Sequence, residues 1–242
     1  MVLLNIFGVE RDIDINATEK DIAKLEAPLG EHEHGWFDSC IGGAKLHSRA
    51  FLPPQGKEIK AVVIFMHGIT GSSGEGFELS DGRKTVVALI HRVFNEAGIA
   101  LHCFDHYGHG YSEGTRFFVP SYQENLQDYI NFVQMVDKKY KGEMPIFLMG
   151  CSYGGTLTIH ASRKFQDNPS LGPRKFGGAL LFCPAVTTEL PPYPVYLLLR
   201  YVLAPLYPKW TPFFMPNPIS ADRVWKDVRV DKKHCLALIL LL

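Results

Sequence analysis

The sequence predicts a single α/β domain in which a mostly parallel β-sheet is flanked by helices on both faces. Short apolar runs of strand length alternate with segments whose apolar residues recur at helical spacing. This alternation is typical of parallel strands joined by crossover helices. A length of 242 residues and a hydrophobic content of 46% also suffice for one sizeable core.

The first predicted strands form an antiparallel hairpin at an edge of the sheet. Residues 36–41 and 44–51 lie on either side of Gly42 and Gly43, and paired glycines between two such runs predict a tight turn. The next strand, residues 61–66 (AVVIFM), is apolar throughout. A continuous run of this length is typical of a strand that is buried on both faces.

The next two elements are a helix and a strand. Apolar residues recur at helical spacing across 86–94, and Gly98 is expected to end this helix. Residues 99–104 are predicted to form the strand that follows. Ser121 and Glu124 then form the spacing of a capping box, which predicts the start of the next helix.

Three elements complete the expected core. Residues 145–149 predict a strand, and a helix that includes 156–160 begins directly after it. Residues 178–183 predict one more buried strand. We therefore expect a domain core over 35–184, preceded by an extension over 1–34.

Composition excludes several classes of protein. The 25 basic and 25 acidic residues cancel, so no global charge favours nucleic acid as a partner. The five cysteines are widely spaced without a CxxC pair, which predicts neither a disulfide framework nor a zinc site. The first apolar run has no basic residues before it, so we expect no secretory signal and a cytoplasmic protein.

The motif that carries chemistry is Gly150-Cys151-Ser152-Tyr153-Gly154, a GxSxG pattern between a predicted strand and a predicted helix. In that context the serine is expected to lie on a tight, strained turn, where the flanking glycines remove colliding side chains. The start of the following helix adds unpaired N–H groups and a positive dipole end. We predict Ser152 as a catalytic nucleophile.

An oxyanion site is expected beside this serine. His67-Gly68 ends the 61–66 strand, and a glycine there lets the backbone approach a reacting carbonyl. The backbone N–H groups of Ile69 and Tyr153 are the predicted donors, and one such donor is typically worth about 3–4 kcal/mol. His67 and Gly68 are predicted to border the substrate, with the His67 side chain bracing the loop rather than acting as a base.

Residues 105–112 (DHYGHGYS) resemble the DxxGHGxS segment of monoacylglycerol lipases and related lysophospholipases, which are α/β-hydrolases. The HG pair, this segment and GxSxG also occur in that family's order, and the resemblance covers roughly residues 35 to 185. It implies structural roles for Asp105 and His109. Cys151 departs from the family, which usually has histidine before the nucleophile, and is expected to pack behind the turn.

The resemblance also implies a lid. Residues 185–227 are rich in proline and apolar residues, and the family inserts an apolar lid at this point. Tyr196 and Leu199 are predicted to contact substrate on a short amphipathic helix. Packing of that helix on the core and peripheral contact with a membrane both remain open.

The acid and base of a serine triad are not recognisable. In α/β-hydrolases they follow the serine on later strands. Only His160 and His234 follow Ser152; His160 falls on the helix after the serine, and His234 lies in an atypical leucine-rich tail over 228–242. We therefore expect a C-terminally truncated chain whose last strands are missing, and His106 or His109 as a substitute base is the minor alternative.

The resemblance implies a serine hydrolase that cleaves esters of monoacylglycerol or lysophospholipid type through an acyl-enzyme. A small-molecule lipid is the expected partner, with no nucleic acid, metal or organic cofactor. The alternative is an inactive, truncated lipid-binding or interaction protein on the same scaffold.

Overall fold

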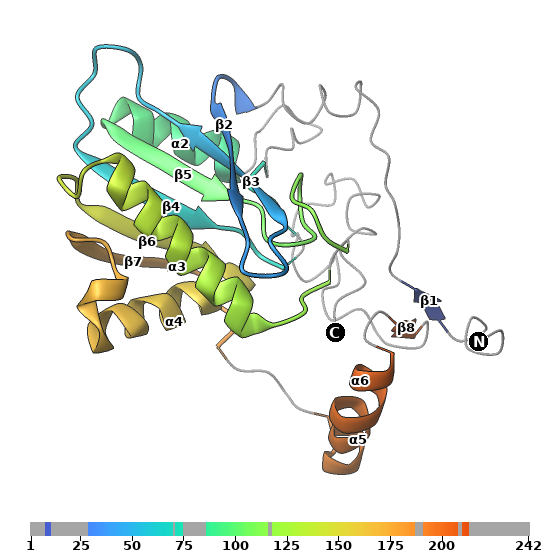
Figure 1. Cartoon of the computed structure of the whole chain (residues 1–242). Helices are drawn as coiled ribbons and strands as arrows, with labels where there is room; N and C mark the ends of the chain where they lie inside the picture. Colours follow the sequence, from blue (N-terminus) through green and yellow to red (C-terminus); the bar gives the residue numbers. More distant parts are fainter. Residues whose placement is uncertain are drawn as a thin grey trace.

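The computed structural model (Figure 1) confirms an α/β fold with a mostly parallel sheet. It describes residues 8–10, 29–69, 71–74, 86–115, 118–186, 191–207 and 210–212. The six strands of the main sheet have the order β2-β3-β5-β4-β6-β7. These strands are β2 (Glu33–Asp38), β3 (Lys45–Phe51), β4 (Ala61–Met66), β5 (Ile99–Phe104), β6 (Ile146–Cys151) and β7 (Phe176–Phe182).

The expected hairpin is present at the sheet edge. β2 and β3 pair antiparallel, and β3 then pairs antiparallel with β5. Gly42 and Gly43 have φ of 61° and 70°, a left-handed conformation that glycine adopts without steric cost. β2 ends at Asp38 rather than residue 41, because the N–H of Ser39 donates to the carbonyl of Ala44 at 2.8 Å and closes the turn there.

The remaining strands are parallel, and helices cover both faces of this part of the sheet. β4 pairs with β5 and β6, and β6 pairs with β7. Side chains of α2 (Val86–Glu96) pack in one apolar cluster with Val63 and Phe65 of β4. Those of α3 (Tyr122–Lys139) and α4 (Tyr153–Asp167) pack with Val62 and Ile64 on the opposite face.

The predicted helix ends are confirmed. Gly98, with φ of 80°, follows the last turn of α2. The hydroxyl of Ser121 caps α3 by accepting a hydrogen bond from the backbone N–H of Glu124 at 3.3 Å. Each signal is local in sequence, which explains why these boundaries were predictable.

β7 differs from the expectation of a buried strand. Leu180, Leu181 and Phe182 are 44%, 42% and 47% exposed. Among the described strands, β7 pairs with β6 alone, so neither its outer edge nor these side chains gain cover from another strand. Its apolar sequence was correctly interpreted as a strand, and the expected burial was wrong.

In residues 185–227, where a lid is expected, the described residues are largely helical. α5 (Tyr193–Leu198), the π-helix η4 (Leu199–Leu203) and α6 (Ala204–Leu206) follow one another and stand apart from the sheet in Figure 1. Beyond them, β8 (Trp210–Pro212) pairs antiparallel with β1 (Gly8–Glu10). Residues 213–242, including His234 and the leucine-rich tail, lie outside the described residues.

Leu29 is fully buried in the cluster that includes α2. Residues assigned to the expected N-terminal extension therefore contribute to the core. Within the described residues, no helix combines the length and the apolar character needed to cross a membrane.

Candidate active site

Ser152 lies at the corner between β6 and α4. Its φ of 52° and ψ of −119° fall in a region that residues other than glycine rarely adopt. The backbone is held there from both sides, since the N–H of Ser152 donates to the carbonyl of Phe182 at 3.0 Å and the N–H of Ala185 donates to the carbonyl of Ser152 at 3.2 Å. The residue is partly exposed, so Ser152 lies at a strained corner that is not closed off from solvent.

The glycines around Ser152 are required by close backbone packing. A Cβ on Gly150 would lie 2.4 Å from the carbonyl oxygen of Gly154. One on Gly154 would lie 2.2 Å from the carbonyl oxygen of Met66, at the end of β4. Both distances are shorter than any real non-bonded carbon–oxygen contact, so the first turn of α4 can lie this close to β6 and to β4 only without these side chains.

The loop after β4 borders Ser152. An ideal Cβ built on Gly68 would lie 3.3 Å from the Cβ of Ser152 and 3.8 Å from its Oγ. Ile69 directly follows Gly68, and Tyr153 directly follows Ser152, so the two predicted donors belong to segments that meet at this serine. The N–H groups in the first turn of α4 have no acceptor within the helix, and the dipole of α4 favours negative charge at this end.

His67 is enclosed and supports this loop. Its side chain is fully buried, with Nδ1 at 2.6 Å from the carbonyl oxygen of Gly68. Its Nε2 accepts a hydrogen bond from the backbone N–H of His106 at 3.1 Å, so the proton is assigned to Nδ1. Burial, reinforced by the nearby His109, lowers the pKa of His67 to about 4. The ring is therefore neutral at physiological pH, and its role in bracing the loop stays a prediction.

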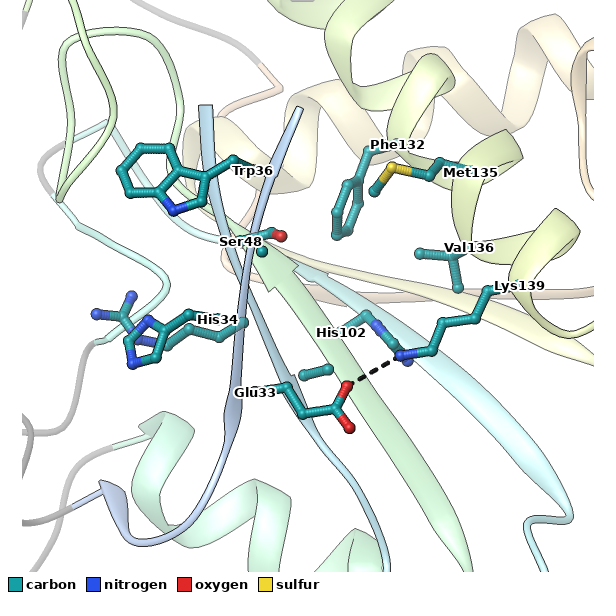
Figure 2. Close-up of a pocket in the computed structure, with 12 residues that line it drawn as sticks. Glu33, His34, Trp36, Ser48, His102, Phe132, Met135, Val136 and Lys139 are labelled. Atoms are coloured by element: carbon teal, nitrogen blue, oxygen red, sulfur yellow. Dashed lines mark hydrogen bonds and ion pairs between the residues drawn. The ribbon is translucent and has the colours of Figure 1, made fainter. Parts of the chain in front are cut away.

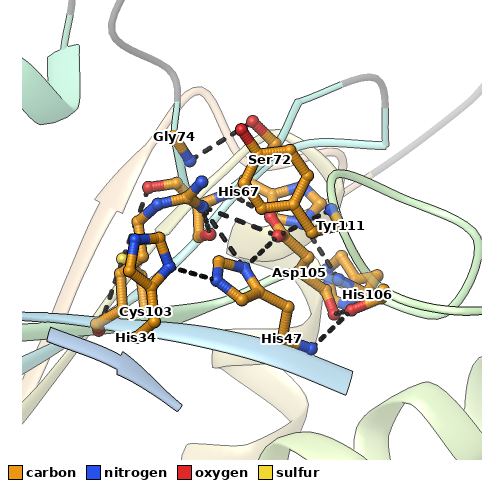
Figure 3. A network of polar contacts seen from close by, with 12 residues as sticks. His34, His47, His67, Ser72, Gly74, Cys103, Asp105, His106 and Tyr111 are labelled. Atoms are coloured by element: carbon orange, nitrogen blue, oxygen red, sulfur yellow. Dashed lines mark hydrogen bonds and ion pairs between the residues drawn. The ribbon is translucent and has the colours of Figure 1, made fainter. Parts of the chain in front are cut away.

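A buried polar network lies beside the loop (Figure 3). The carboxylate of Asp105 accepts hydrogen bonds from Nδ1 of His47 at 2.8 Å, from the backbone N–H of Tyr111 at 3.1 Å and from that of Ser73. The guanidinium of Arg49 lies 3.6 Å from the same carboxylate. Burial alone would raise the pKa of Asp105, but the His47 hydrogen bond and the Arg49 charge hold it well below its usual value.

The 105–112 segment is folded around the Asp105 carboxylate. A Cβ on Gly110 would lie 2.2 Å from the Cγ of Asp105, and the Ser112 hydroxyl donates to the Asp105 carbonyl at 2.6 Å. His109 places Nδ1 at 2.8 Å from the carbonyl oxygen of Tyr107 and Nε2 against that of Ile69. These contacts connect the segment to the loop beside Ser152 and favour the structural roles implied for Asp105 and His109.

Within the described part of the chain, the Ser152 hydroxyl makes no hydrogen bond to a histidine. Both ring nitrogens of His109 face backbone carbonyls, and His160 is exposed on α4 with its ring 5.2 Å from that of Tyr122. His106 is buried, and burial lowers its pKa well below the usual value. The nine histidines of the described ranges therefore include no base bonded to Ser152.

The predicted lid residues are partly buried on the α5–η4 segment. Tyr196 lies on α5 and its hydroxyl accepts a hydrogen bond from Arg200, whereas Leu199 begins η4. Figure 1 shows this segment apart from the corner between β6 and α4. The structure thus does not bring Tyr196 and Leu199 to Ser152, and their contact with substrate stays a prediction.

A cavity of about 260 Å³ lies elsewhere, between the β2–β3 hairpin and α3 (Figure 2). Its polar side chains are paired: Lys139 contacts Glu33 at 3.0 Å, and Nε2 of His102 lies 2.9 Å from the Tyr140 hydroxyl. Burial, with Lys139 nearby, lowers the pKa of His102 to about 3. Ser152 and the loop after β4 do not line this cavity, so it has no part in the candidate site.

The structure also identifies residues that the sequence did not. His47 and Arg49 lie on β3, more than fifty positions before the Asp105 carboxylate that they contact. No motif marks them. Within the described ranges, no three His, Cys, Asp or Glu side chains are grouped so as to hold a metal ion.

Comparison with known proteins places the sequence among hydrolases. The family described as Serine aminopeptidase, S33 (Hydrolase_4) matches residues 57–235. Relatives include monoglyceride lipase of Rattus norvegicus, 32% identical over 52% of this chain and 36% of the relative. A monoglyceride lipase homolog of Monkeypox virus is 30% identical over 55% of this chain and 41% of the relative. An uncharacterized abhydrolase domain-containing protein of Dictyostelium discoideum is 29% identical over 72% of this chain and 16% of the relative.

Among solved structures, a soluble variant of monoglyceride lipase from Saccharomyces cerevisiae in complex with a substrate analog superposes with a TM-score of 0.51. It is 17% identical and covers 83% of this chain and 57% of that chain. This similarity supports the fold. The chain spans less than half the length of each of the curated relatives named above.

Proposed function

The chain belongs to the serine aminopeptidase S33 family, and on that premise we propose that it is a serine hydrolase that cleaves carboxylic esters through an acyl-enzyme on Ser152. The observation that carries the proposal is the conformation of Ser152. A non-glycine residue with φ of 52° at a strand-to-helix corner, bordered by Gly68, is the geometry that a nucleophilic serine requires.

In the proposed reaction, the Ser152 oxygen attacks the ester carbonyl while a base takes its proton. The N–H groups of Ile69 and Tyr153 stabilise the oxyanion, the alcohol leaves with a proton, and water then hydrolyses the acyl-enzyme. His67 and the Asp105 network hold the loop that carries Ile69. Since no described histidine bonds to Ser152, we propose that the base comes from outside the described residues. Of the ten histidines in the chain, only His234 lies there.

We propose a monoacylglycerol or a lysophospholipid as the substrate class. Three of the relatives are monoglyceride lipases of mammals, which supports a lipid ester. We propose that the apolar side chains of residues 193–206, with Tyr196 and Leu199 among them, contact the acyl chain, and that Gly68 contacts the ester beside Ser152. Exposed Tyr193, Tyr201 and Leu206 in the same segment support peripheral contact with lipid surfaces.

A fluorophosphonate probe tests the nucleophile, because it labels an activated serine covalently and needs no knowledge of the substrate. We expect mass spectrometry to find the label on Ser152. The Ser152→Ala variant should lose the label, and the matched control Ser170→Ala, at an exposed serine after α4, should keep it. A label on another serine, or none on a folded chain, would contradict the proposal.

The substrate class is tested separately by release of fatty acid from a monoacylglycerol and from a lysophospholipid. Release that depends on Ser152 supports the proposed reaction. Retention of the intact lipid with neither release nor labelling would instead indicate a binding protein. The rate of fatty-acid release by the His234→Gln variant shows whether His234 is the base. Loss of release would identify His234 as the base, and unchanged release would exclude it.

A further inference from the structure

We propose that Cys151 and Cys183 form a reversible disulfide beside Ser152, which makes this corner a site of oxidative modification. Both residues are thiols in the structure, and their sulfur atoms lie 3.8 Å apart. Cys151 is half-buried and immediately precedes Ser152, whereas Cys183 is exposed. An oxidant can therefore reach the Cys183 sulfur from solvent, and the Cys151 sulfur is already in contact with the Cys183 sulfur.

Strand pairing brings the two residues together. Cys151 is paired with Phe182 across β6 and β7, and Cys183 is the next residue along the chain. An ideal strand spacing of about 4.8 Å and rise of about 3.3 Å would place the two Cα atoms roughly 5.8 Å apart. Disulfides in proteins join Cα atoms about 4.4–6.8 Å apart, so the backbone needs no large movement to permit the bond.

The backbone of Cys183 explains why its side chain faces Cys151. In a regular strand, Cys183 would point to the opposite side of the sheet from Phe182 and from the paired Cys151. Its φ of 37° departs from strand geometry and turns the side chain back toward β6. The sulfurs then have to approach by only about 1.8 Å to reach the bonded distance, a movement within the range of side-chain rotation at an exposed residue.

The chemistry balances with hydrogen peroxide as the oxidant. The thiolate of Cys183 attacks one peroxide oxygen, which gives a sulfenic acid and, after protonation of the leaving hydroxide, one water. The Cys151 thiolate then attacks the Cys183 sulfur, and the sulfenic oxygen leaves as a second water. Two thiols lose two protons and two electrons, and the peroxide is reduced to two waters. An added dithiol reverses the reaction by thiol–disulfide exchange.

The crosslink would act on Ser152 through the groups that hold its backbone. Phe182 accepts the Ser152 N–H, and Ala185 donates to the Ser152 carbonyl while accepting a hydrogen bond from the Thr156 hydroxyl at 2.7 Å. Drawing Cys183 toward Cys151 moves the segment between these two partners. We expect the oxidised form to lose at least tenfold in the rate at which Ser152 reacts with a fluorophosphonate. This second effect rests on the proposed function, whereas formation of the disulfide does not.

The decisive experiment treats the whole chain with a small excess of hydrogen peroxide and maps its peptides without reduction. We expect one crosslinked peptide pair that joins Cys151 to Cys183 and weighs two hydrogen atoms less than the reduced pair. A thiol count under denaturing conditions should fall from five to three and return to five with dithiothreitol. Cys183 recovered as a sulfinic acid with Cys151 still a thiol, or a crosslink to Cys40 or Cys235, would overturn the proposal.

Matched variants separate this site from the other thiols. Cys183→Ser and Cys183→Gly should both abolish the crosslink, and glycine also tolerates the positive φ, so at least one variant is expected to retain the fold by circular dichroism. Cys40→Ser removes another exposed thiol and should leave the crosslink unchanged. If the crosslink forms but Ser152 labels equally in both redox states, the disulfide stands and its effect on the serine is refuted.

Discussion

Asp105 illustrates what a single buried residue contributes to this structure. Its carboxylate is fully buried, yet it accepts hydrogen bonds from His47 and from two backbone N–H groups and faces the charge of Arg49. A buried charge is tolerated only with such compensation. The network holds the 105–112 segment, which in turn contacts the loop beside Ser152.

Asp105→Asn should lower the free energy of unfolding by about 3–5 kcal/mol, because the change removes a buried carboxylate charge that His47 and Arg49 compensate. Urea unfolding followed by circular dichroism measures this loss. Asp38→Asn is the matched control, since Asp38 pairs with Lys45 on the surface with 65% of its side chain exposed. Equal effects of the two substitutions would show that the Asp105 network adds no stability.

The stability difference between the wild type and Asp105→Asn should also depend on pH. The pKa of Asp105 is lowered in the folded protein, so the stability it contributes is complete above its ordinary value of 3.8. As the pH falls below that value toward the folded pKa, this contribution is lost. Unfolding curves should therefore converge below about pH 4 and stay separate near neutrality; a constant difference over this range would contradict the prediction.

At the scale of residues, local motifs were predictable and long-range partners were not. The tight corner at Ser152 follows from five consecutive residues, and the close approach of Gly68 follows from the order of the strands. The pairing of His47 and Arg49 with Asp105 depends on β3 lying beside β5. Neither the hairpin motif nor the 105–112 motif contains information about that pairing.

At the scale of elements, β7 is the least protected strand of the main sheet. Three consecutive large apolar side chains, Leu180 to Phe182, are more than two-fifths exposed. The strand pairs, among those described, only with β6. Open backbone groups beside apolar side chains favour the addition of another strand.

We expect the chain to self-associate through β7, and Leu181→Lys to weaken that association at least tenfold without loss of stability. A charge on an edge strand opposes pairing with a second strand. Sedimentation over a series of concentrations measures the association. Val93→Lys is the control, because Val93 is 63% exposed on α2, away from the edge. Unchanged association of Leu181→Lys would refute the role of β7.

The sequences of the strands predicted where each strand lies along the chain better than they predicted how far its side chains are buried. The bounds of β4 and β5 match the expected runs 61–66 and 99–104, because β4 is apolar throughout, β5 is apolar except for His102, and both are flanked by polar or glycine residues. β7 has a similar apolar sequence and is exposed. Burial depends on what packs against a strand, and the strand's own residues do not specify its neighbours.

At the scale of the whole molecule, stability is concentrated at the centre of the sheet. β4 is paired on both sides and packed between α2 on one face and α3 and α4 on the other, and all but its first residue is buried. The helical segment over 193–206 is mostly exposed and stands apart from the sheet. Local opening is easiest where few buried contacts have to break.

Hydrogen exchange should therefore differ sharply between these regions. We expect amides of β4 and β6 to exchange at least a hundredfold more slowly than those of α5 and α6, because exchange in the central strands requires global unfolding. Mass spectrometry of peptides after timed labelling measures the difference. Similar rates in the two regions would show that the helical segment is as firmly packed as the sheet.

The strand order has a consequence for folding during translation. After β4 is synthesised, β5 pairs with one edge of β4, and the earlier β2–β3 hairpin pairs with the other edge of β5. β6 then pairs with the second edge of β4, and β7 pairs with β6. Each newly synthesised strand of the parallel part thus meets an edge that already exists. A nascent chain can build this sheet outward during translation, without waiting for a later segment to be threaded between strands already paired.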